Sequence, residues 1–571
     1  MEPEGLSMFD LVLIATYERT IKSGVVYWVV ALLALVLSAP AVNAQQPNIL
    51  FLLADDLGWA DLSGGHTNFG NGSDFYETPN IERMANQGMS FTSMYAAQNC
   101  LPSRVALLTG QYAPRNGVYN VGSLNRSGDQ TPLIGPSDSN SIRADAITLA
   151  ETLKAAGYTT AHFGKFHATA SAADIIEQYG FDFNFGGTQA GSPSAANGYF
   201  AVEVSPGIWQ YDDEVSLELD AYAQPYTQQY IDETLRPYAN GANVDALVGT
   251  PKHLTDALTD AAIDFMRMQQ GSGQPFFMNF AYYLVHAPKH PRPDLLEKYR
   301  QKRQTNPSQI DHDNIKFAAM VEGLDQSLGR IFDFLQDPNG DGDISDSLAA
   351  NTLTIFSSDN GGTGGSEHNA PLTGIKGTHT EGGLRVPMVA WRPGTIPAGV
   401  VSNAMANITD FYATFAALAG APLPHPDIHP LDSIAIGPVL EGDILAHTRQ
   451  ANYLHFPGYL DVRAVPNSLI IKNVGGQHYK LRYFYEDPDG DYTEYTGGHY
   501  ELYNVTTDLS EKSNLLAAPV NAEVQAIAAQ LSQDLRSWLD EVGAIYPTVR
   551  DPLTGQNTGI IVLPPEPLPA P

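Results

Sequence analysis

Short, unbroken apolar runs alternate with amphipathic stretches along much of this chain. The apolar runs at residues 48–54, 158–163, 275–283 and 351–357 predict strands, and the amphipathic stretches at 80–87, 147–156, 255–269 and 315–335 predict helices. Runs of this kind are typical of strands buried on both faces of a parallel sheet. Their alternation with helices predicts the α/β class, with a large mixed, mostly parallel sheet flanked by helices.

The pattern changes after about residue 450. Short strands are expected at 468–474, 478–485 and 501–505, followed by a helix at 521–542. We therefore expect a catalytic domain at residues 45–449 and a smaller C-terminal α+β subdomain with a small antiparallel sheet at 450–550. Residues 551–571 form a Pro-rich tail, and its part from Leu563 onward is expected to lack regular structure.

The beginning of the chain has the features of an export signal. An apolar run at 25–39 follows Arg19 and Lys22, and Val42-Asn43-Ala44 is a small-residue cleavage site. The run is short for a membrane span. Residues 1–44 are therefore expected to be a signal peptide, which predicts an exported protein, periplasmic or secreted, with no membrane attachment after cleavage.

The formal net charge of −32 excludes some classes of partner. Nucleic acids and anionic lipid surfaces are bound by basic surfaces, so neither is expected here. If the substrate is an anion, the acidic chain must provide a local basic pocket.

Polar side chains follow the predicted strands at the points where they end. Asp55 and Asp56 follow the first strand, Lys165 and His167 the second, His286 the third, and Asp359 and Asn360 the fourth. Ligands of open α/β sheets gather beyond the carboxyl ends of the strands. Three carboxylates and a carboxamide suit a hard divalent cation, so Ca²⁺ is expected and Mg²⁺ is the alternative.

The chain has a single cysteine, Cys100, so it can form no intrachain disulfide. Pro102 fits the first turn of a helix and Gly110 its end, which places Cys100 at a helix N-terminus. A lone cysteine can be a small buried apolar residue. At a helix N-terminus, however, the partial positive charge favours an anion and a reactive role.

The stretch Cys100-Leu101-Pro102-Ser103-Arg104 followed by Thr109-Gly110 resembles the signature of the type I sulfatases of the alkaline phosphatase superfamily. Further elements are similar to the family's pattern in the same order, and the resemblance spans about residues 47–545. These elements are Asp55-Asp56-Leu57-Gly58, Gly164-Lys165-Phe166-His167 (with Phe166 in a position often held by tryptophan), Asp359-Asn360-Gly361-Gly362, Gly374-Ile375-Lys376-Gly377, Glu381-Gly382-Gly383-Leu384-Arg385-Val386-Pro387 and Leu502-Tyr503-Asn504-Val505.

The resemblance implies an alkaline-phosphatase-like fold and a role for each matched residue. Cys100 would be converted to formylglycine by a formylglycine-generating enzyme, and its hydrate would attack sulfur with one hydroxyl and expel sulfate with the other. The metal ligands would be Asp55, Asp56, Asp359, Asn360 and an oxygen of modified Cys100. His286 would be the acid for the leaving oxygen, His167 the base for the elimination, and Arg104, Lys165 and Lys376 would hold the sulfate oxygens and the hydrate.

The predicted function is therefore hydrolysis of sulfate esters, with a sulfated polysaccharide or oligosaccharide as the expected substrate. An arylsulfatase, or a phosphonate or phosphate monoester hydrolase of the same superfamily, is the alternative. A binding module with a decayed site is disfavoured because every expected catalytic position is filled.

Four features stay open at the level of sequence. His290 competes with His286 for the acid role, and His379 could contact the sulfate. Residues 337–348 resemble the first part of an EF-hand loop, but Leu348 stands where a bidentate Glu is needed. The aromatic residues between Tyr199 and Tyr238 fit either a substrate cleft or ordinary packing.

Overall fold

The computed structural model describes residues 46–571 except 129–130, 366–367, 444–445, 447–448, 462, 487–494, 496 and 518. The expected signal peptide at 1–44 lies outside the described residues. Within the described part of the chain, no helix is long and apolar enough to cross a membrane.

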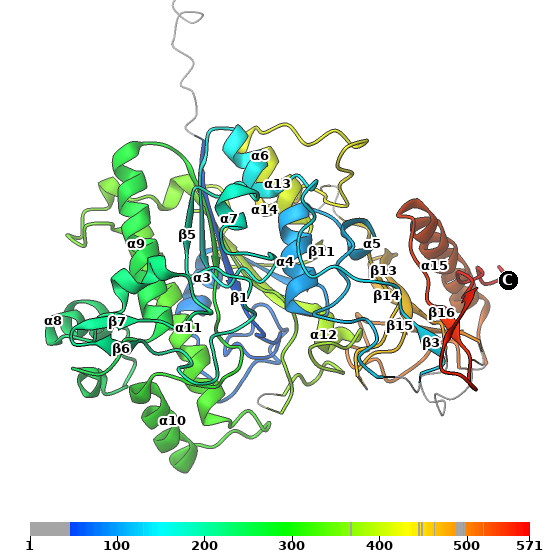
Figure 1. Cartoon of the computed structure of the whole chain (residues 1–571), viewed down its shortest axis with the longest axis horizontal. Helices are drawn as coiled ribbons and strands as arrows, with labels where there is room; N and C mark the ends of the chain where they lie inside the picture. Colours follow the sequence, from blue (N-terminus) through cyan, green and yellow to red (C-terminus); the bar gives the residue numbers. More distant parts are fainter. Residues whose placement is uncertain are drawn as a thin grey trace, which may run out of the picture. The chain divides into compact units, whose positions relative to one another are not determined.

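An eight-stranded sheet forms the centre of the protein (Figure 1). Its strands are, in spatial order, β11 (Val400–Asn407), β2 (Met89–Tyr95), β10 (Arg385–Trp391), β9 (Thr352–Ser358), β1 (Asn48–Ala54), β8 (Phe276–Ala281), β4 (Thr159–Gly164) and β5 (Phe183–Phe185). Only β10 runs antiparallel to its neighbours, β2 and β9. The predicted fold class, a large mixed and mostly parallel sheet, is confirmed.

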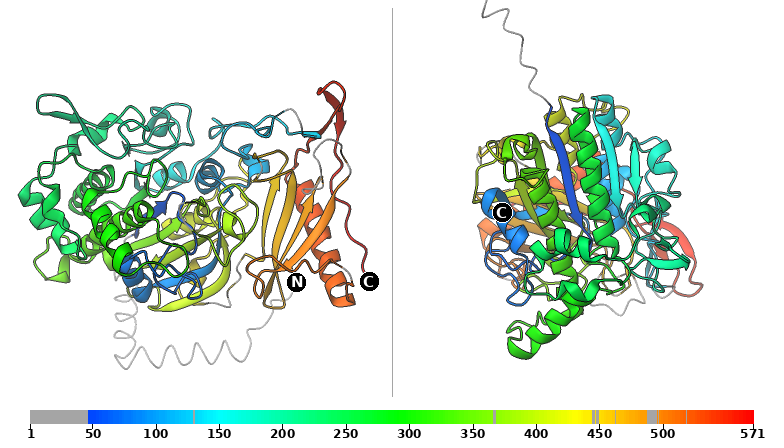
Figure 2. Two further views of the ribbon diagram at one scale, coloured as in Figure 1. Left: turned by 90° about the horizontal axis from the view of Figure 1, so that it is seen from below. Right: turned by 90° about the vertical axis from the view of Figure 1, so that its left-hand side faces the viewer.

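Helices cover both faces of this sheet, as the right-hand view of Figure 2 shows around β1. Successive side chains of a strand point to opposite faces. Leu50 and Leu52 of β1 therefore pack in one apolar cluster with α3 (Pro79–Gln87), α9 (Leu254–Ser272) and α11 (Ile315–Gln336). Ile49, Phe51 and Leu53 pack in the other cluster, with α4 (Cys100–Thr109), α6 (Leu149–Ala155) and α13 (Asp410–Ala419).

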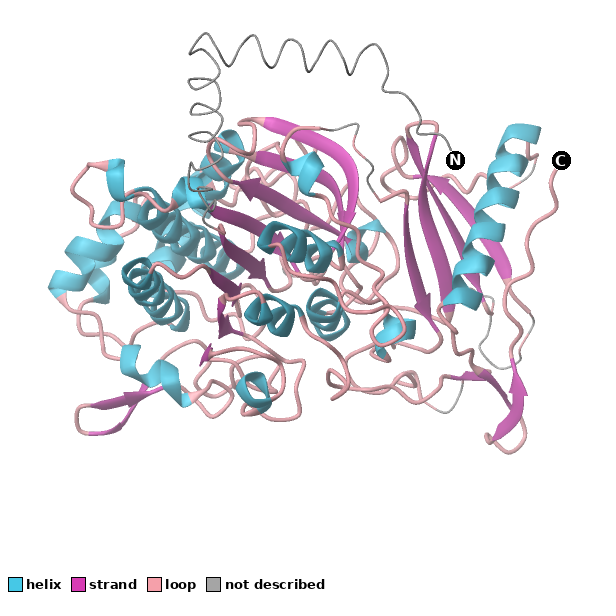
Figure 3. Cartoon of the chain, turned by 90° about the horizontal axis from the view of Figure 1, so that it is seen from above, coloured by secondary structure: helices cyan, strands magenta, loops and turns pink. Residues whose placement is uncertain are grey.

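The C-terminal part has its own antiparallel sheet, covered on one face by a long helix (Figure 3). The strand order is β12 (Ala451–Phe456), β13 (Asn467–Val474), β14 (Gln477–Phe484) and β15 (His499–Asn504), and the helix is α15 (Ala522–Glu541). Ile470, Leu481 and Leu502 of the sheet pack against Leu531 and Leu535 of the helix.

A third, three-stranded sheet joins distant parts of the sequence. Its order is β17 (Asn557–Ile561), β16 (Thr548–Arg550) and β3 (Leu133–Ile134). Within the Pro-rich tail at 551–571, residues 557–561 form a strand that pairs with β16, and the part from Leu563 onward contains no helix or strand. Residues 47–571 form one compact unit, so the boundary at 449/450 stays a prediction.

The remaining elements are short or peripheral. They are α5 (Ala113–Asn116), α7 (Asp174–Glu177), α8 (Gln228–Tyr230), α10 (Pro293–Thr305), α12 (Glu381–Leu384), α14 (Gly437–Leu440), β6 (Val202–Ser205) and β7 (Ile208–Gln210). The aromatic segment between β5 and α9 packs mainly inward, because Tyr199, Tyr211 and Tyr226 are buried.

Candidate active site

The four expected oxygen ligands meet where β1 and β9 end. These strands are parallel neighbours with Ala54 opposite Ser358, so the residues that follow them emerge side by side. The Asp56 N–H donates to Asp359 Oδ1 (3.2 Å), and Asn360 Nδ2 donates to Asp56 Oδ1 (2.9 Å). Asp55, Asp56, Asp359 and Asn360 are all buried. The sheet topology therefore builds one compact group of oxygen atoms.

Cys100 begins α4 and lies beside this group. Its side chain is buried, and Lys376 Nζ lies 3.0 Å from its Sγ and 2.6 Å from Asp56 Oδ1. Burial raises the pKa of the Cys100 thiol, although Lys165 and Lys376 act in the opposite direction. The site therefore holds the thiol protonated, and an unmodified thiolate is not the nucleophile that this environment favours.

The basic residues that an anionic substrate requires are present, and each is paired with an acid of the site. Arg104 donates to Asp359 Oδ2 from Nε (3.0 Å) and from a terminal guanidinium nitrogen (2.7 Å). Lys165 Nζ donates to Asp55 Oδ2 (2.6 Å), and Lys376 pairs with Asp56 as described above. Three cations therefore balance three carboxylates, and a bound divalent cation would leave the site with a net positive charge suited to a sulfate ester.

The surrounding charges give two of the buried acids, Asp56 and Asp359, very different pKa values. Burial opposes ionisation of Asp56, but the charges of Lys376 and Lys165 outweigh it and hold the Asp56 pKa well below its usual range. Burial and the neighbouring Asp55 charge raise the pKa of Asp359 to about 6. A divalent cation near Asp359 would favour its ionised form.

His286 and His167 lie at the same site, in different surroundings. His286 Nε2 is 3.7 Å from Asp56 Oδ2, and the side chain is 23% exposed. Burial and the Lys165 charge lower the pKa of His286 to about 3. Burial and the same lysine lower the pKa of His167 well below its usual value. The buried Nδ1 of His167 has no hydrogen-bond partner in the described part of the chain.

The two competing histidines lie in other contacts. The His290 ring lies against Gly198, where an added Cβ would be only 1.8 Å from Nδ1. His379 is buried, bonds to Asn467 and packs its ring on Phe456. The structure therefore places His286, and neither of these two, beside Asp56.

The carboxylate and carboxamide oxygens of the site fit a hard cation. Asp55, Asp56, Cys100 and His286 can each offer one ligand atom within 4.8 Å of the others. In addition, Asp55 Oδ1 and Asn360 Oδ1 are buried and accept no hydrogen bond from the described residues. Buried oxygen atoms without partners are costly unless a cation or water satisfies them. His286 was predicted from the sequence to lie at the strand ends as the acid for the leaving oxygen, but its ring was not predicted to lie within reach of a cation bound by this group.

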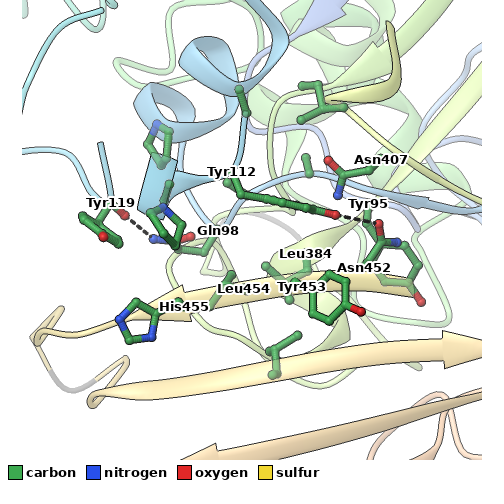
Figure 4. A pocket seen from close by; sticks show the side chains of 18 of the residues that line it. Tyr95, Gln98, Tyr112, Tyr119, Leu384, Asn407, Asn452, Tyr453, Leu454 and His455 are labelled. Atoms are coloured by element: carbon green, nitrogen blue, oxygen red, sulfur yellow. Dashed lines mark hydrogen bonds between the residues drawn. The ribbon is translucent and has the colours of Figure 1, made fainter. Parts of the chain in front are cut away.

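Residues close to Cys100 in the sequence also line a pocket on the side of the C-terminal sheet (Figure 4). Gln98 and Pro102 line it, and Gln98 Nε2 donates to the Tyr119 carbonyl (2.7 Å). Its other walls are mostly apolar and include Tyr112, Tyr453 and Leu384. None of the site residues described above lines this pocket, so the chemistry lies on the strand-end side of Cys100.

A buried cysteine at a helix N-terminus, next to strand-end carboxylates on this type of sheet, defines a hydrolase site of the alkaline phosphatase type. The family described as "Sulfatase" matches residues 47–421, and "N-sulphoglucosamine sulphohydrolase, C-terminal" matches 376–540. The chain belongs to the sulfatase family and is a sulfuric ester hydrolase.

Individual relatives agree with this assignment. A "Sulfatase" of Formosa agariphila is 42% identical over 87% of this chain and 89% of its own. The "N-acetylgalactosamine-6-sulfatase" of Canis lupus familiaris is 34% identical over 72% of this chain and 70% of its own. The solved structure of "Ps i-CgsB" is 26% identical, with a TM-score of 0.59, and covers 86% of this chain and 93% of its own.

Proposed function

We propose that this enzyme removes sulfate from a sulfated polysaccharide or oligosaccharide, with a formylglycine made from Cys100 and a divalent cation, Ca²⁺ or alternatively Mg²⁺. The observation that carries the proposal is the position of Cys100: its buried side chain lies beside both the Lys376 ammonium group and the carboxylates that follow β1. The arrangement supplies a nucleophile position, a cation site and charge for an anionic ester in one place.

The cation would be held by Asp55, Asp56, Asp359, Asn360 and an oxygen of modified Cys100, and the free oxygens of Asp55 and Asn360 support this set. A divalent cation at such a site acts as a Lewis acid that activates an oxygen nucleophile and stabilises charge on the ester. Asp359 would also fix the Arg104 guanidinium, which donates to it twice.

Modification of Cys100 by a formylglycine-generating enzyme would supply two geminal hydroxyls, one for attack on sulfur and one for release of sulfate. Lys376 is placed to hold a proton-bearing group at this position, because Nζ already lies 3.0 Å from the side chain of residue 100. Asp56 holds the Lys376 pKa well above its usual value against the effect of burial, so this lysine keeps its charge.

We assign His286 as the acid for the leaving sugar oxygen and His167 as the base for the elimination. The His286 side chain is 23% exposed and can meet a substrate from solvent. Both rings are neutral in the free protein, since their pKa values are lowered. A bound sulfate ester would bring negative charge close to His286 and raise its pKa, so protonation of this acid is linked to substrate binding.

The glycan substrate class is supported by the relatives, because one of them is named for N-acetylgalactosamine-6-sulfate. A panel of sulfated monosaccharides and polysaccharides, assayed for released sulfate, tests it directly. Aryl sulfate and aryl phosphate belong in the same panel. If only the aryl sulfate is hydrolysed, the enzyme is an arylsulfatase. If the aryl phosphate is hydrolysed faster than the sulfate esters, the enzyme is a phosphate or phosphonate monoester hydrolase.

We also propose that the enzyme is exported, periplasmic or secreted, and loses residues 1–44. The support is the pattern of Arg19, Lys22, the apolar run and Val42-Asn43-Ala44. N-terminal sequencing of the mature protein should begin at Gln45. A mature chain that retains the apolar run would contradict cleavage at this site.

A further inference from the structure

The loop that carries His286 is held on one side by the candidate cation site. Asp55 N–H donates to the Leu284 carbonyl (2.8 Å), and Val285 N–H donates to the Asp55 carbonyl (2.6 Å). These reciprocal bonds fix the loop start to the end of β1. The rest of the loop, from His286 to His290, is positioned by other residues.

Tyr199 contacts the same loop from the opposite side. Its hydroxyl lies 2.6 Å from the Tyr283 carbonyl and 2.9 Å from the His286 carbonyl, and it shares its one proton between them. Tyr199 is completely buried, and burial raises its pKa well above the usual value, so the hydroxyl stays a donor. One hydroxyl therefore joins the beginning of the turn to the backbone of His286 itself.

His253 holds the far end of the loop. Its Nδ1 accepts a hydrogen bond from Thr255 N–H (3.3 Å), so in the neutral ring Nε2 carries the proton and donates to the His290 carbonyl (3.2 Å). Burial lowers the pKa of His253 to about 4, which keeps the ring neutral at pH 7. Both ends of the loop are thus bound by side chains that take no part in the chemistry.

The two holding residues form one unit. Their rings are stacked, with centroids 5.3 Å apart and planes within 5° of parallel. The Tyr199 carbonyl accepts a bond from Leu254 N–H (2.7 Å), where α9 begins directly after His253. The pair is therefore mounted on the first turn of a long helix, which is a rigid support.

We propose that Tyr199 and His253 are positioning residues for the leaving-group acid: together they fix the backbone of residues 283–290 so that the His286 ring faces Asp56. The inference rests on the proposed role of His286. It also gives a function to part of the aromatic segment, since Tyr199 acts through the loop and does not touch the substrate.

Tyr199→Phe is the decisive variant, because it removes the hydroxyl and keeps the ring stacked on His253. A displacement of a catalytic group by about 1 Å can cost about 100-fold in rate. We expect kcat on a sugar sulfate to fall about 10- to 100-fold, with KM changed less than about 3-fold. An activated aryl sulfate, whose leaving group needs no proton, should lose less than about 3-fold.

The matched control is Tyr158→Phe. Tyr158 is also buried and also donates to a backbone carbonyl, that of Pro47 (2.7 Å), before β1 and away from the loop. This variant should keep wild-type kcat on both substrates. His253→Phe, which retains an aromatic ring but cannot bond His290, should behave like Tyr199→Phe in the same assays.

A double-mutant cycle separates positioning from general stability. If Tyr199 acts through His286, Tyr199→Phe should change kcat on the sugar sulfate less than about 3-fold when His286 is already Ala. Three outcomes would each overturn the proposal. Tyr199→Phe could lower kcat by the same factor with and without the His286→Ala change, it could lower kcat equally on the two substrates, or it could leave kcat within about 2-fold of wild type.

A measurement independent of activity separates this inference from the proposed function. Hydrogen–deuterium exchange of peptides that cover residues 283–290 should be faster in Tyr199→Phe than in wild type or Tyr158→Phe. If the wild-type enzyme hydrolyses no sulfate ester, the proposed function is wrong. The hydrogen–deuterium exchange rates then test by themselves whether Tyr199 holds the loop. Exchange unchanged in this loop would overturn the proposal.

Discussion

Lys376 Nζ lies 3.0 Å from Cys100 Sγ and 2.6 Å from Asp56 Oδ1, so one ammonium group joins the helix that carries the cysteine to the strand end that carries the acids. Lys376 comes from the loop between β9 and β10, far from both partners in sequence. The contact shows that three separate segments build one charge-balanced site, and the predictions below test its parts.

The first prediction concerns Cys100. In active enzyme the Cys100 peptide should be about 18 Da lighter than its thiol form, the mass change for replacing CH₂–SH by CHO. Cys100→Ser should form a covalent sulfate ester, seen as a gain of about 80 Da with substrate, because one hydroxyl can attack but none remains to expel sulfate. Intact-protein mass spectrometry measures both.

Cys100→Ala is the control for this experiment. It should show neither turnover nor adduct and should remain folded, since one small buried side chain is lost. Full multiple turnover in this variant would eliminate the formylglycine mechanism and leave an activated water as the nucleophile.

The second prediction concerns the cation. Chelation should abolish sulfate release, and added Ca²⁺ or Mg²⁺ should restore it. Asp359→Ala should reduce kcat by at least about 100-fold, because it removes a ligand and leaves the buried Arg104 without its main partner. Asp333→Ala, a half-exposed acid away from the site, is the control. Undiminished activity after thorough chelation would contradict the cation site.

The third prediction separates His286 from His290. His286→Ala should lower kcat on a sugar sulfate about 100- to 10,000-fold and on an activated aryl sulfate far less, since only the sugar oxygen needs a proton. His290→Ala should have a small effect on both, because its ring lies against Gly198. Steady-state kinetics on the two substrates gives the comparison, and equal losses would move the acid role to another group.

The fourth prediction is a pH dependence of stability. His455 bonds to Ser468 Oγ (2.7 Å) and the Ile545 carbonyl (2.9 Å), and burial lowers its pKa to about 4. Because the folded-state pKa is below the unfolded value of about 6.5, its contribution is full above pH 6.5 and is lost as the pH falls toward 4. The loss is on the order of 3 kcal/mol.

Urea unfolding at pH 7.5 and pH 5 measures the part of this contribution that is lost above pH 5, about 2 kcal/mol. His455→Gln should reduce the difference in unfolding free energy between the two pH values, since it removes the titrating group. His425→Gln, at an exposed histidine, should leave the difference as in wild type. An unchanged difference in His455→Gln would show that this ring is not the group responsible.

Sequence patterns predicted four strands of the central sheet, β1, β4, β8 and β9. The run at 48–54 is β1 with the same bounds, and the helix expected at 315–335 is α11. The strands β2, β10 and β11 were not predicted from the sequence. Strand β2 pairs with both β10 and β11, and this pairing is decided by tertiary contacts, which local periodicity does not contain.

The sequence predicts those parts of the site in which the side chains directly follow the end of a strand. Neighbouring parallel strands must bring Asp55, Asp56, Asp359 and Asn360 together, so their grouping followed from their positions in the sequence. The choice between His286 and His290 was not predictable in this way. It depends on the backbone path of one loop, which Tyr199 determines from a distant segment.

The three-stranded sheet contains the last strands of the chain to be synthesised, and this bears on when the Cys100 side chain is accessible. Cys100 is 2% exposed, so the proposed modification would have to take place before the chain has folded around this residue. The interval from Cys100 to the start of β17 is 557 − 100 = 457 residues. At about 5–20 residues per second, roughly 20 to 90 s of synthesis separate the two. The last strand to be made, β17, pairs with β16, and β16 pairs with β3, so the fold is complete only after the whole of this interval has been synthesised.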